Sequence, residues 1–412
     1  MRRIAALLPL LLACSETVTP AADAGPVAPD APTWHQDVAP IIAEHCQRCH
    51  LEGGIGPFAL TEYEQAKALA GGIAASTASR RMPPFLADNS GDCNTWRDAN
   101  WLSDEKIAVL DAWAAAGAPE GEPVDAPVPP TLPTIDNPEL TVTMEAPFEP
   151  NAELADEYRC FVLDPELDSD TYVTAYEVMP GDERVVHHVI LYAPNDADAE
   201  AEAEALDGED EKAGYSCYGG SRVDADMIVA WAPGTGATSF PEGSGLQLKA
   251  GRKLIMQVHY NMVGGSFPDQ SSIKLRTADR VANPGRMSIV GVPGLEIPPG
   301  VEGHVESGEV DLRDLPVSIN LWGILPHMHE LGTSIGLSLE RGDQSQCLID
   351  VPRWDFNWQL GYFLEEPVRI EPGDRVKTTC TFDSRSRDEV TTFGDGTQDE
   401  MCLAIVFVTM AL

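Results

Sequence analysis

Short segments rich in β-branched residues, separated by Gly, Pro and Asp, fill the chain from about residue 139 to its end. This pattern is typical of antiparallel β-sandwiches, and the length suffices for two domains of ordinary size. Apolar residues at helical spacing occur instead in the amino-terminal third. We therefore predict a multidomain protein in which a small all-α domain precedes two all-β antiparallel sandwich domains.

The helical pattern predicts two helices. Val38, Ile41 and Ile42 fall at helical spacing, and Asp37 lies near the start of that helix, where a negative charge is favourable. A second helix begins after a possible cap at Ser103 and stops at Gly117. Its predicted core face consists of Ile107, Leu110 and Trp113 or Ala114.

Between the two helices lies the motif Cys46-Gln47-Arg48-Cys49-His50. C-x-x-C-H is the motif that attaches c-type haem, with thioether bonds to Cys46 and Cys49 and with His50 as the proximal iron ligand. A redox dithiol and half a zinc site are the alternatives, but no second cysteine pair follows. Helices flanking a haem are similar to a small class I cytochrome c, so residues 34–118 are predicted to be an all-α cytochrome c domain with one covalently bound haem c.

The distal haem ligand is predicted to be Met82. In Arg80-Arg81-Met82-Pro83-Pro84 it resembles the methionine that such cytochromes carry on a proline-bearing loop. A core-filling methionine is the alternative. His35 and His45 are the other candidates, but His45 is almost adjacent to the attachment motif and His35 precedes the first helix.

Compositional changes mark the segments around this domain. Residues 1–13 have the charged and apolar regions of a signal peptide, and Leu11-Leu12-Ala13-Cys14 resembles a bacterial lipobox. Cys14 is therefore predicted to carry a lipid that holds the protein on a membrane, with ordinary cleavage as the alternative. Residues 14–33 are predicted to be a flexible tether, and the proline-rich residues 119–138 a semi-rigid linker.

Six residues later in the chain carry the most informative chemistry. Neutral imidazole suits copper, and a methionine thioether favours the cuprous state. The residues are His187, His188, His259, His327, His329 and Met401, and their grouping indicates two copper sites. For any single histidine among them, a hydrogen-bonded or half-buried side chain is the alternative interpretation.

The two histidine pairs make different structural demands. Neighbours on a regular strand point to opposite faces, so His187 and His188 can share a metal only if the backbone is irregular, for instance at a bulge. His327 and His329 are two positions apart, so on a strand they share a face without distortion.

The motifs His-His-Val, Gln-Val-His-Tyr, His-Met-His and Glu400-Met401-Cys402 occur in the order and approximate spacing of the copper type II, ascorbate-dependent monooxygenases. This resemblance covers roughly residues 140–412. It implies two jelly-roll-like domains, 139–280 with the electron-transfer copper at His187, His188 and His259, and 281–412 with the oxygen-binding copper at His327, His329 and Met401. Gln257 and Tyr158 match residues that line the space between the coppers.

The resemblance also implies disulfides. It pairs Cys160 with Cys217, and Cys380 with Cys402, which leaves Cys93 and Cys347 either free or bridging the domains. Disulfides and covalent haem both require an oxidising compartment. We therefore predict an extracytoplasmic protein, in the periplasm or at the outer membrane, anchored through the lipid on Cys14.

The substrate positions depart from the peptide-hydroxylating members of this family. Those members place an arginine two residues before the His-x-His pair, where this chain has Leu325. They follow the methionine ligand with an asparagine and a tyrosine, where this chain has Leu403 and Ile405. Because an apolar pocket does not offset the desolvation of a carboxylate, a neutral or apolar small molecule is predicted.

The net charge of the chain further limits the classes of molecule that it can bind. The formal net charge is -39 at pH 7, which repels phosphate backbones, so no nucleic-acid partner is expected. The acidic stretch 196–212 is predicted to be a solvated insertion, with docking of a basic redox partner as the alternative.

These features together predict an enzyme that hydroxylates a C-H bond with O2. Ascorbate supplies the electrons in animal members of the family, whereas here the fused haem is predicted to feed the copper at His187, His188 and His259. An ascorbate-like reductant or a periplasmic redox protein would be the external one-electron donor. The rivals are a non-enzymatic haem and copper electron-transfer or copper-binding protein of the cell envelope, and a degenerate monooxygenase fold used for binding.

Overall fold

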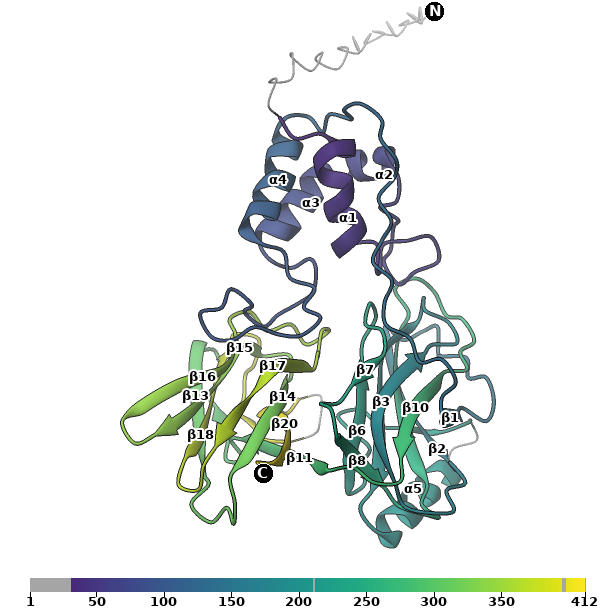
Figure 1. Ribbon diagram of the computed structural model, residues 1–412, viewed down its shortest axis with the longest axis vertical. Helices are drawn as coiled ribbons and strands as arrows, with labels where there is room; N and C mark the ends of the chain where they lie inside the picture. Colours follow the sequence, from purple (N-terminus) through teal and green to yellow (C-terminus); the bar gives the residue numbers. More distant parts are fainter. Residues whose placement is uncertain (1–30, 210–211, 395–397, 412) are drawn as a thin grey trace, which may run out of the picture.

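The computed structural model describes residues 31–209, 212–394 and 398–411. The predicted signal peptide, the predicted lipid attachment at Cys14 and most of the predicted tether lie outside these residues. A helical region is followed by two β-sandwiches that lie side by side (Figure 1). Within the described residues, no helix is both long enough and apolar enough to span a membrane.

The helical region contains a π-helical turn and four helices around one small core. The elements are η1 (Trp34–Val38), α1 (Ala39–His45), α2 (Tyr63–Ala68), α3 (Ala70–Ala78) and α4 (Asp104–Ala115). The first predicted helix thus begins earlier, at Trp34. Ser103 caps α4 by accepting a hydrogen bond from the Lys106 amide, as predicted. Leu110 and Trp113 of α4 are fully buried, and Ile107 is partly buried against the same core.

The first sandwich has two layers that share one core. One layer has the order β1 (Leu140–Thr143), β10 (Ser272–Ala278), β3 (Thr171–Met179) and β8 (Ser244–Leu248), with β7 (Thr238–Ser239) also paired to β3. The other has the order β5 (Tyr215–Ser216), β2 (Asp156–Leu163), β9 (Leu254–Asn261), β4 (Val186–Pro194) and β6 (Ala225–Trp231). The predicted solvated insertion forms helix α5 (Ala197–Glu209), in which Ala199 and Ala203 are buried.

The second sandwich repeats this two-layer plan. One layer has the order β11 (Asn283–Gly291), β20 (Cys402–Met410), β14 (Ile319–Met328) and β17 (Tyr362–Ile370). The other has the order β13 (Glu302–Asp311), β18 (Arg375–Asp383), β15 (Gly332–Arg341) and β16 (Gln344–Val351). A small pair, β12 (Glu296–Ile297) with β19 (Thr391–Thr392), lies beside them.

The two sandwiches are joined through a shared sheet. β11 pairs with β8 in parallel, with Asn283 opposite Ser244 and Pro284 opposite Gly245. This short parallel ladder is the exception to the predicted antiparallel pattern, and it makes one layer of each sandwich continuous with the other. β10 ends at Ala278 and β11 begins at Asn283, so the predicted division near residue 280 lies between them.

A loop of the helical region, residues 85–97, extends onto both sandwiches, and we call it the strap. Leu86, Ala87 and Trp96 belong to the core of the second sandwich. Cys93 forms a disulfide with Cys347, which decides between the two alternatives left open for these cysteines. Arg97 donates hydrogen bonds to the carbonyl oxygens of Phe363 and Ser239, one in each sandwich. The strap therefore connects the helical region to both β-domains.

Candidate functional site

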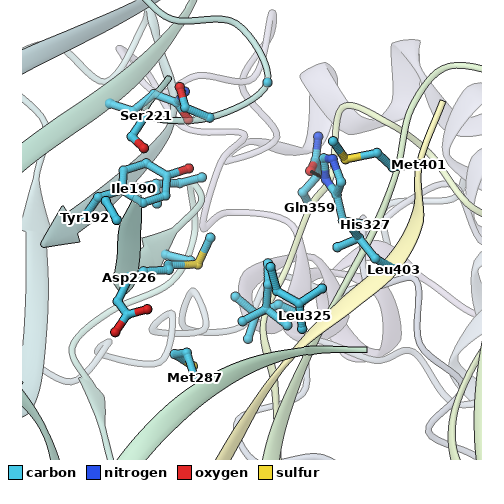
Figure 2. A pocket seen from close by; sticks show the side chains of 18 of the residues that line it. Ile190, Tyr192, Ser221, Asp226, Met287, Leu325, His327, Gln359, Met401 and Leu403 are labelled. Carbon is cyan, nitrogen blue, oxygen red and sulfur yellow. Dashed lines mark hydrogen bonds between the residues drawn. The ribbon is translucent and has the colours of Figure 1, made fainter. Parts of the chain in front are cut away.

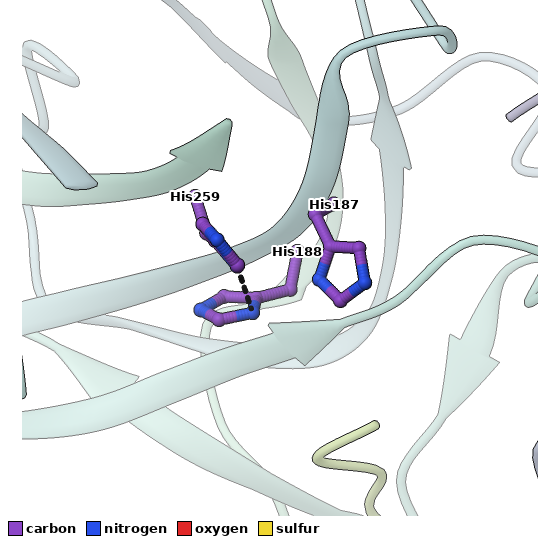
Figure 3. A group of neighbouring side chains, drawn as sticks. All are labelled: His187, His188 and His259. Atoms are coloured by element: carbon purple, nitrogen blue, oxygen red, sulfur yellow. Dashed lines mark hydrogen bonds between the residues drawn. The ribbon is translucent and has the colours of Figure 1, made fainter. Parts of the chain in front are cut away.

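Three histidines of the first sandwich form a buried cluster on neighbouring strands. The ladder between β4 and β9 shifts register between Val186 and His188, so His187 occupies a bulge and turns to the same side as His188. This is the irregularity that the adjacent pair requires. His188 lies opposite His259 in the ladder, and one possible ligand atom from each of the three imidazoles lies within 4.8 Å of the others (Figure 3).

The imidazole rings of this cluster are oriented so that ring nitrogens of different histidines lie close together. His259 Nε2 bonds Asp156 Oδ1 at 2.9 Å, while its Nδ1 lies 3.3 Å from Nδ1 of His188. Nδ1 of His187 is buried without a hydrogen-bond partner. Burial lowers the pKa of His187 to about 3 and lowers the pKa of His188 well below its ordinary value. The imidazoles are therefore neutral, which is the form that binds metal.

Tyr158 and Gln257 lie beside this cluster. Tyr158 is opposite His259 in the β2–β9 ladder, and its ring stacks on the imidazole with centroids 4.1 Å apart. Gln257, two positions before His259, is buried and donates to the carbonyl oxygens of Cys217 and Gly220. The disulfide between Cys160 and Cys217, implied by the family resemblance, is present. Both predicted residues line one cavity.

His327, His329 and Met401 come together at the adjoining ends of β14 and β20. His327 lies opposite Leu403 in the ladder, and the rings of His327 and His329 are 5.2 Å apart. Met401 immediately precedes β20 and lines the same cavity as the two imidazoles. The second predicted disulfide joins Cys402, next to Met401, to Cys380.

Hydrogen bonds to neighbouring residues orient these two imidazoles as well. His329 Nδ1 donates to the Asp399 carbonyl oxygen at 3.1 Å, which leaves Nε2 buried without a partner. His327 Nδ1 lies 2.6 Å from Oε1 of Gln359, and burial lowers the pKa of His327 to about 4. The buried Glu400 carboxylate accepts hydrogen bonds from the backbone amides of His329 and Met401, so it holds both ligand segments together.

A cavity of about 710 Å³ lies between the two clusters. Figure 2 shows His327, Met401, Leu325 and Leu403 on the side of the second sandwich, facing Ile190 and Tyr192 of the first. Ile405, the third apolar position singled out in the sequence, also lines this space. Cavities of this size accommodate small organic ligands.

Sequence reasoning missed the residues that connect the two clusters. The ring of Trp358 lies 5.3 Å from His187, and the next residue, Gln359, bonds His327. Tyr218 lies 4.8 Å from Tyr158 and 6.5 Å from His329, measured between ring centroids. These side chains come from loops that carry no periodic pattern, and the available signal was the position of Tyr218 directly after Cys217.

The cysteine motif lies at the end of α1, where Cys46 follows His45. Cys46 and Cys49 carry free thiols, and burial raises the pKa of Cys46 to about 12. His50 stacks on Phe58, and its Nδ1 donates to the Phe58 carbonyl oxygen at 3.0 Å, which leaves Nε2 available to bind a metal. Met82 is 36% exposed.

His45 and His35 are engaged elsewhere. His45 is buried between Asn100 Oδ1 at 2.9 Å and Lys106 Nζ at 2.7 Å. His35 Nε2 lies 3.6 Å from a carboxylate oxygen of Glu120. Met82 thus remains the better candidate for a distal haem ligand.

The residues present fit the metal that the pattern implies. Each cluster presents an unpartnered buried imidazole nitrogen, His187 Nδ1 in the first and His329 Nε2 in the second. The first cluster supplies three nitrogens, and the second supplies two nitrogens with a thioether sulfur. Imidazole and thioether together are ligands that suit copper in both of its common oxidation states.

Comparison with known proteins gives relatives for the β-region. Tyramine beta-hydroxylase of Caenorhabditis briggsae is 26% identical over 63% of this chain and 46% of its own length. Human DBH-like monooxygenase protein 1 is 29% identical over 55% of this chain and 40% of its own length. Peptidyl-glycine alpha-amidating monooxygenase A of Xenopus laevis is 28% identical over 60% and 26%, respectively. The chain thus spans less than half the length of these relatives.

Family models match both sandwiches. The N-terminal domain of copper type II ascorbate-dependent monooxygenase matches residues 141–265, and the C-terminal domain of the same family matches residues 287–409. Members of this family bind two copper ions and use O2, a small-molecule substrate and ascorbate. With both domains matched in order and both ligand clusters assembled, the chain belongs to the copper type II ascorbate-dependent monooxygenases.

Proposed function

We propose that the protein is a copper-dependent monooxygenase that hydroxylates a C-H bond of a small molecule with O2. The observation that carries the proposal is the pair of buried, unpartnered nitrogens, His187 Nδ1 and His329 Nε2, in two imidazole clusters that border one cavity. Copper held there would supply the one-electron redox chemistry that oxygen activation requires. The overall reaction takes two electrons and two protons, places one oxygen atom in the product and releases the other as water.

The roles assigned to the two clusters follow from their shapes. His187, His188 and His259 surround one point with three imidazoles, which suits a metal that only passes electrons. His327, His329 and Met401 open onto the cavity, where substrate can approach. Tyr158 and Gln257 shape the wall between them. A catalytic metal needs such an open side, whereas a carrier does not.

The substrate is proposed to be neutral or apolar. Leu325, Leu403 and Ile405 form the wall beside His327, and Leu325 and Leu403 are each only 7% exposed. The charged side chains that line the cavity belong to the first sandwich and are exposed to solvent; they are Glu202, Arg222, Asp224 and Asp226. Among the described lining residues, a buried carboxylate would therefore find no cation beside the second cluster.

A second proposal concerns electron supply: a haem c bound through Cys46, Cys49 and His50, with Met82 as distal ligand, feeds the first cluster. Two observations support it. Both motif cysteines are free while the other described cysteines form disulfides. The Nδ1 of His50 is held by the Phe58 carbonyl oxygen, which is how a metal-binding histidine is commonly oriented. An extracytoplasmic location with a lipid on Cys14 agrees with this chemistry and is proposed with it.

The decisive experiment is anaerobic reduction of the copper-loaded, haem-containing protein, followed by mixing with O2 and a pool of neutral organic compounds. Haem oxidation that depends on copper and accompanies a hydroxylated product is expected. Haem that stays reduced, with no product, would instead indicate a carrier protein or a different electron donor.

The substrate class is tested by Leu325→Arg, with Leu325→Met as the apolar control. We expect the parent and the Met variant to prefer a neutral substrate over its carboxylate analogue, and the Arg variant to shift toward the carboxylate. Equal preference in all three proteins would contradict an apolar specificity wall.

A further inference from the structure

The cysteine motif touches the first sandwich directly. A Cβ atom placed on Gly234 would lie 3.2 Å from Sγ of Cys49 and 3.5 Å from the Cβ of Arg48. Glu183 lies close enough to Cys49 to act on it electrostatically. Gly234 therefore contacts the motif, and the carboxylate of Glu183 lies near the same residue.

The segments of Gly234 and Glu183 adjoin the strand that carries His187 and His188. Glu183 lies in the turn that leads into β4. Gly234 follows β6, the strand paired with β4, in which Trp231 lies opposite Val189. The Trp231 indole Nε1 donates to the Thr235 carbonyl oxygen at 3.0 Å. A connection thus runs from Gly234 and Thr235 through the hydrogen bond of Trp231 and the β6–β4 ladder to the residue after His188.

Residues 232–237, which we call the docking loop, are held from two further sides. The Ala237 amide donates to the Pro133 carbonyl oxygen of the linker at 2.7 Å. Two residues beyond the loop, the Ser239 carbonyl oxygen accepts a hydrogen bond from Arg97 of the strap at 3.0 Å. The linker and the strap therefore fix the docking loop against the cysteine motif.

We infer that the docking loop and Glu183 form the surface on which the Cys49 edge of a bound haem rests, and that electrons cross from this edge to the His187, His188 and His259 cluster through the docking loop. The inference rests on the proposed haem and copper. One electron leaves the ferrous haem, which becomes ferric, and reduces a cupric ion to the cuprous state. No bond forms or breaks, and an external one-electron donor of the ascorbate type restores the ferrous haem.

Gly234 offers a sharp test because the chain contains a matched control. Gly234 has φ +82° and Gly251 has φ +64°, so a Cβ strains the backbone at both positions. A Cβ on Gly251 meets nothing within 4 Å, whereas one on Gly234 presses on Cys49. Gly234→Ala therefore displaces the motif, and Gly251→Ala reproduces only the backbone strain.

The measurement uses the full chain with haem and copper bound, without O2 or substrate. A photogenerated one-electron reductant reduces the haem, and the first-order reoxidation of the haem by copper is followed by absorbance. A Cβ on Gly234 forces the motif to shift by a few tenths of an ångström. Because electron transfer slows as donor and acceptor move apart, Gly234→Ala is expected to slow reoxidation severalfold. Gly251→Ala is expected to match the parent. Equal rates in the two variants would overturn the inference.

A second variant reports on the contact without copper. Removing a negative charge near the haem favours the ferrous state, so Glu183→Gln is expected to raise the haem reduction potential of the copper-free protein. Glu389→Gln, at an exposed position of the second sandwich, is the charge control and should leave the potential unchanged. Equal potentials in both variants would count against Glu183 as part of the surface.

The outcomes separate this inference from the function on which it rests. Protein without covalently attached haem, or without copper in the first cluster, would overturn the proposed electron supply together with this route. Protein that binds both, and whose haem reoxidation is insensitive to Gly234→Ala, would overturn the route alone.

Discussion

The two histidine clusters each supply three donor atoms, but they differ in the kind of donor and in how far they open onto the cavity. In the first cluster three imidazoles converge from adjacent strands, with ligand atoms within 4.8 Å of one another. In the second, two imidazoles and a thioether stand at one wall of the cavity. All three residues of the second cluster line the cavity, whereas His188 is the residue of the first cluster that does so. The second cluster is therefore more accessible to a substrate, which supports its proposed role as the reacting site and the proposed role of the first as the electron-passing site.

The hydrogen-bond partners of the two clusters differ in charge. Asp156, a carboxylate, bonds His259 in the first cluster, whereas the neutral amide of Gln359 bonds His327 in the second. A carboxylate partner makes an imidazole more basic and favours the higher metal charge. The neutral partner, together with the Met401 thioether, favours the cuprous state. The second site is thus the one suited to meet oxygen in its reduced form.

The largest effect is expected from Met401→His, which makes the second cluster resemble the first. The variant should still bind copper but lose hydroxylation by more than about 100-fold, because loss of an outer hydrogen-bond partner alone costs about 10- to 100-fold. Product formation and bound copper are measured together.

Met287→Leu is the control for Met401→His, since Met287 lines the same cavity but lies on β11. It should keep most activity. Full hydroxylation by the Met401→His protein would contradict the role of the thioether.

The next-largest effect is on copper affinity, and it tests whether each hydrogen-bond partner acts only on the cluster that it contacts. Asp156→Asn should weaken copper binding at the first cluster by about 10- to 100-fold, and Gln359→Leu should do the same at the second. Copper titration of each variant, followed by electron paramagnetic resonance, distinguishes the two sites. Equal weakening of both sites by either change would show that the clusters do not bind independently.

The sequence predicted which residues come together in the two clusters, and the need for an irregular strand at His187 followed from its adjacency to His188 alone. It could not predict the partners, because Asp156 lies 103 residues from His259 and meets it only through strand register. The contacts of the strap could not be predicted from the sequence either. Its disulfide joins cysteines separated by 254 residues, and Trp96 is buried in a domain far along the chain. Periodicity reports which face of an element is buried, not which distant loop covers it.

A smaller effect is expected in the pH dependence of the stability of the metal-free protein. Burial lowers the pKa of His187 to about 3 and of His327 to about 4, below the ordinary value of 6.5. The unfolded chain therefore takes up protons first as the pH falls. Stability is fully present above pH 6.5 and decreases toward pH 4, by about 1.4 kcal/mol per pH unit for each histidine.

Chemical unfolding at pH 6.5 and 5.5 measures this slope. His187→Asn and His327→Asn should each flatten it. Copper should suppress the slope by holding the imidazoles neutral. Identical slopes in all variants would contradict buried neutral histidines in the metal-free protein.

The smallest effect separates the ring of Tyr158 from its hydroxyl group. The ring stacks on His259 with an angle of 6° between planes, and such contacts contribute about 0.5 to 1.5 kcal/mol. Tyr158→Phe keeps the stack and should leave copper affinity at the first cluster nearly unchanged, whereas Tyr158→Leu should weaken it by about 2- to 12-fold, which is that free energy expressed as a ratio. If Phe weakens binding as much as Leu, the hydroxyl supports the site. The first cluster would then depend on polar contacts as well as on packing.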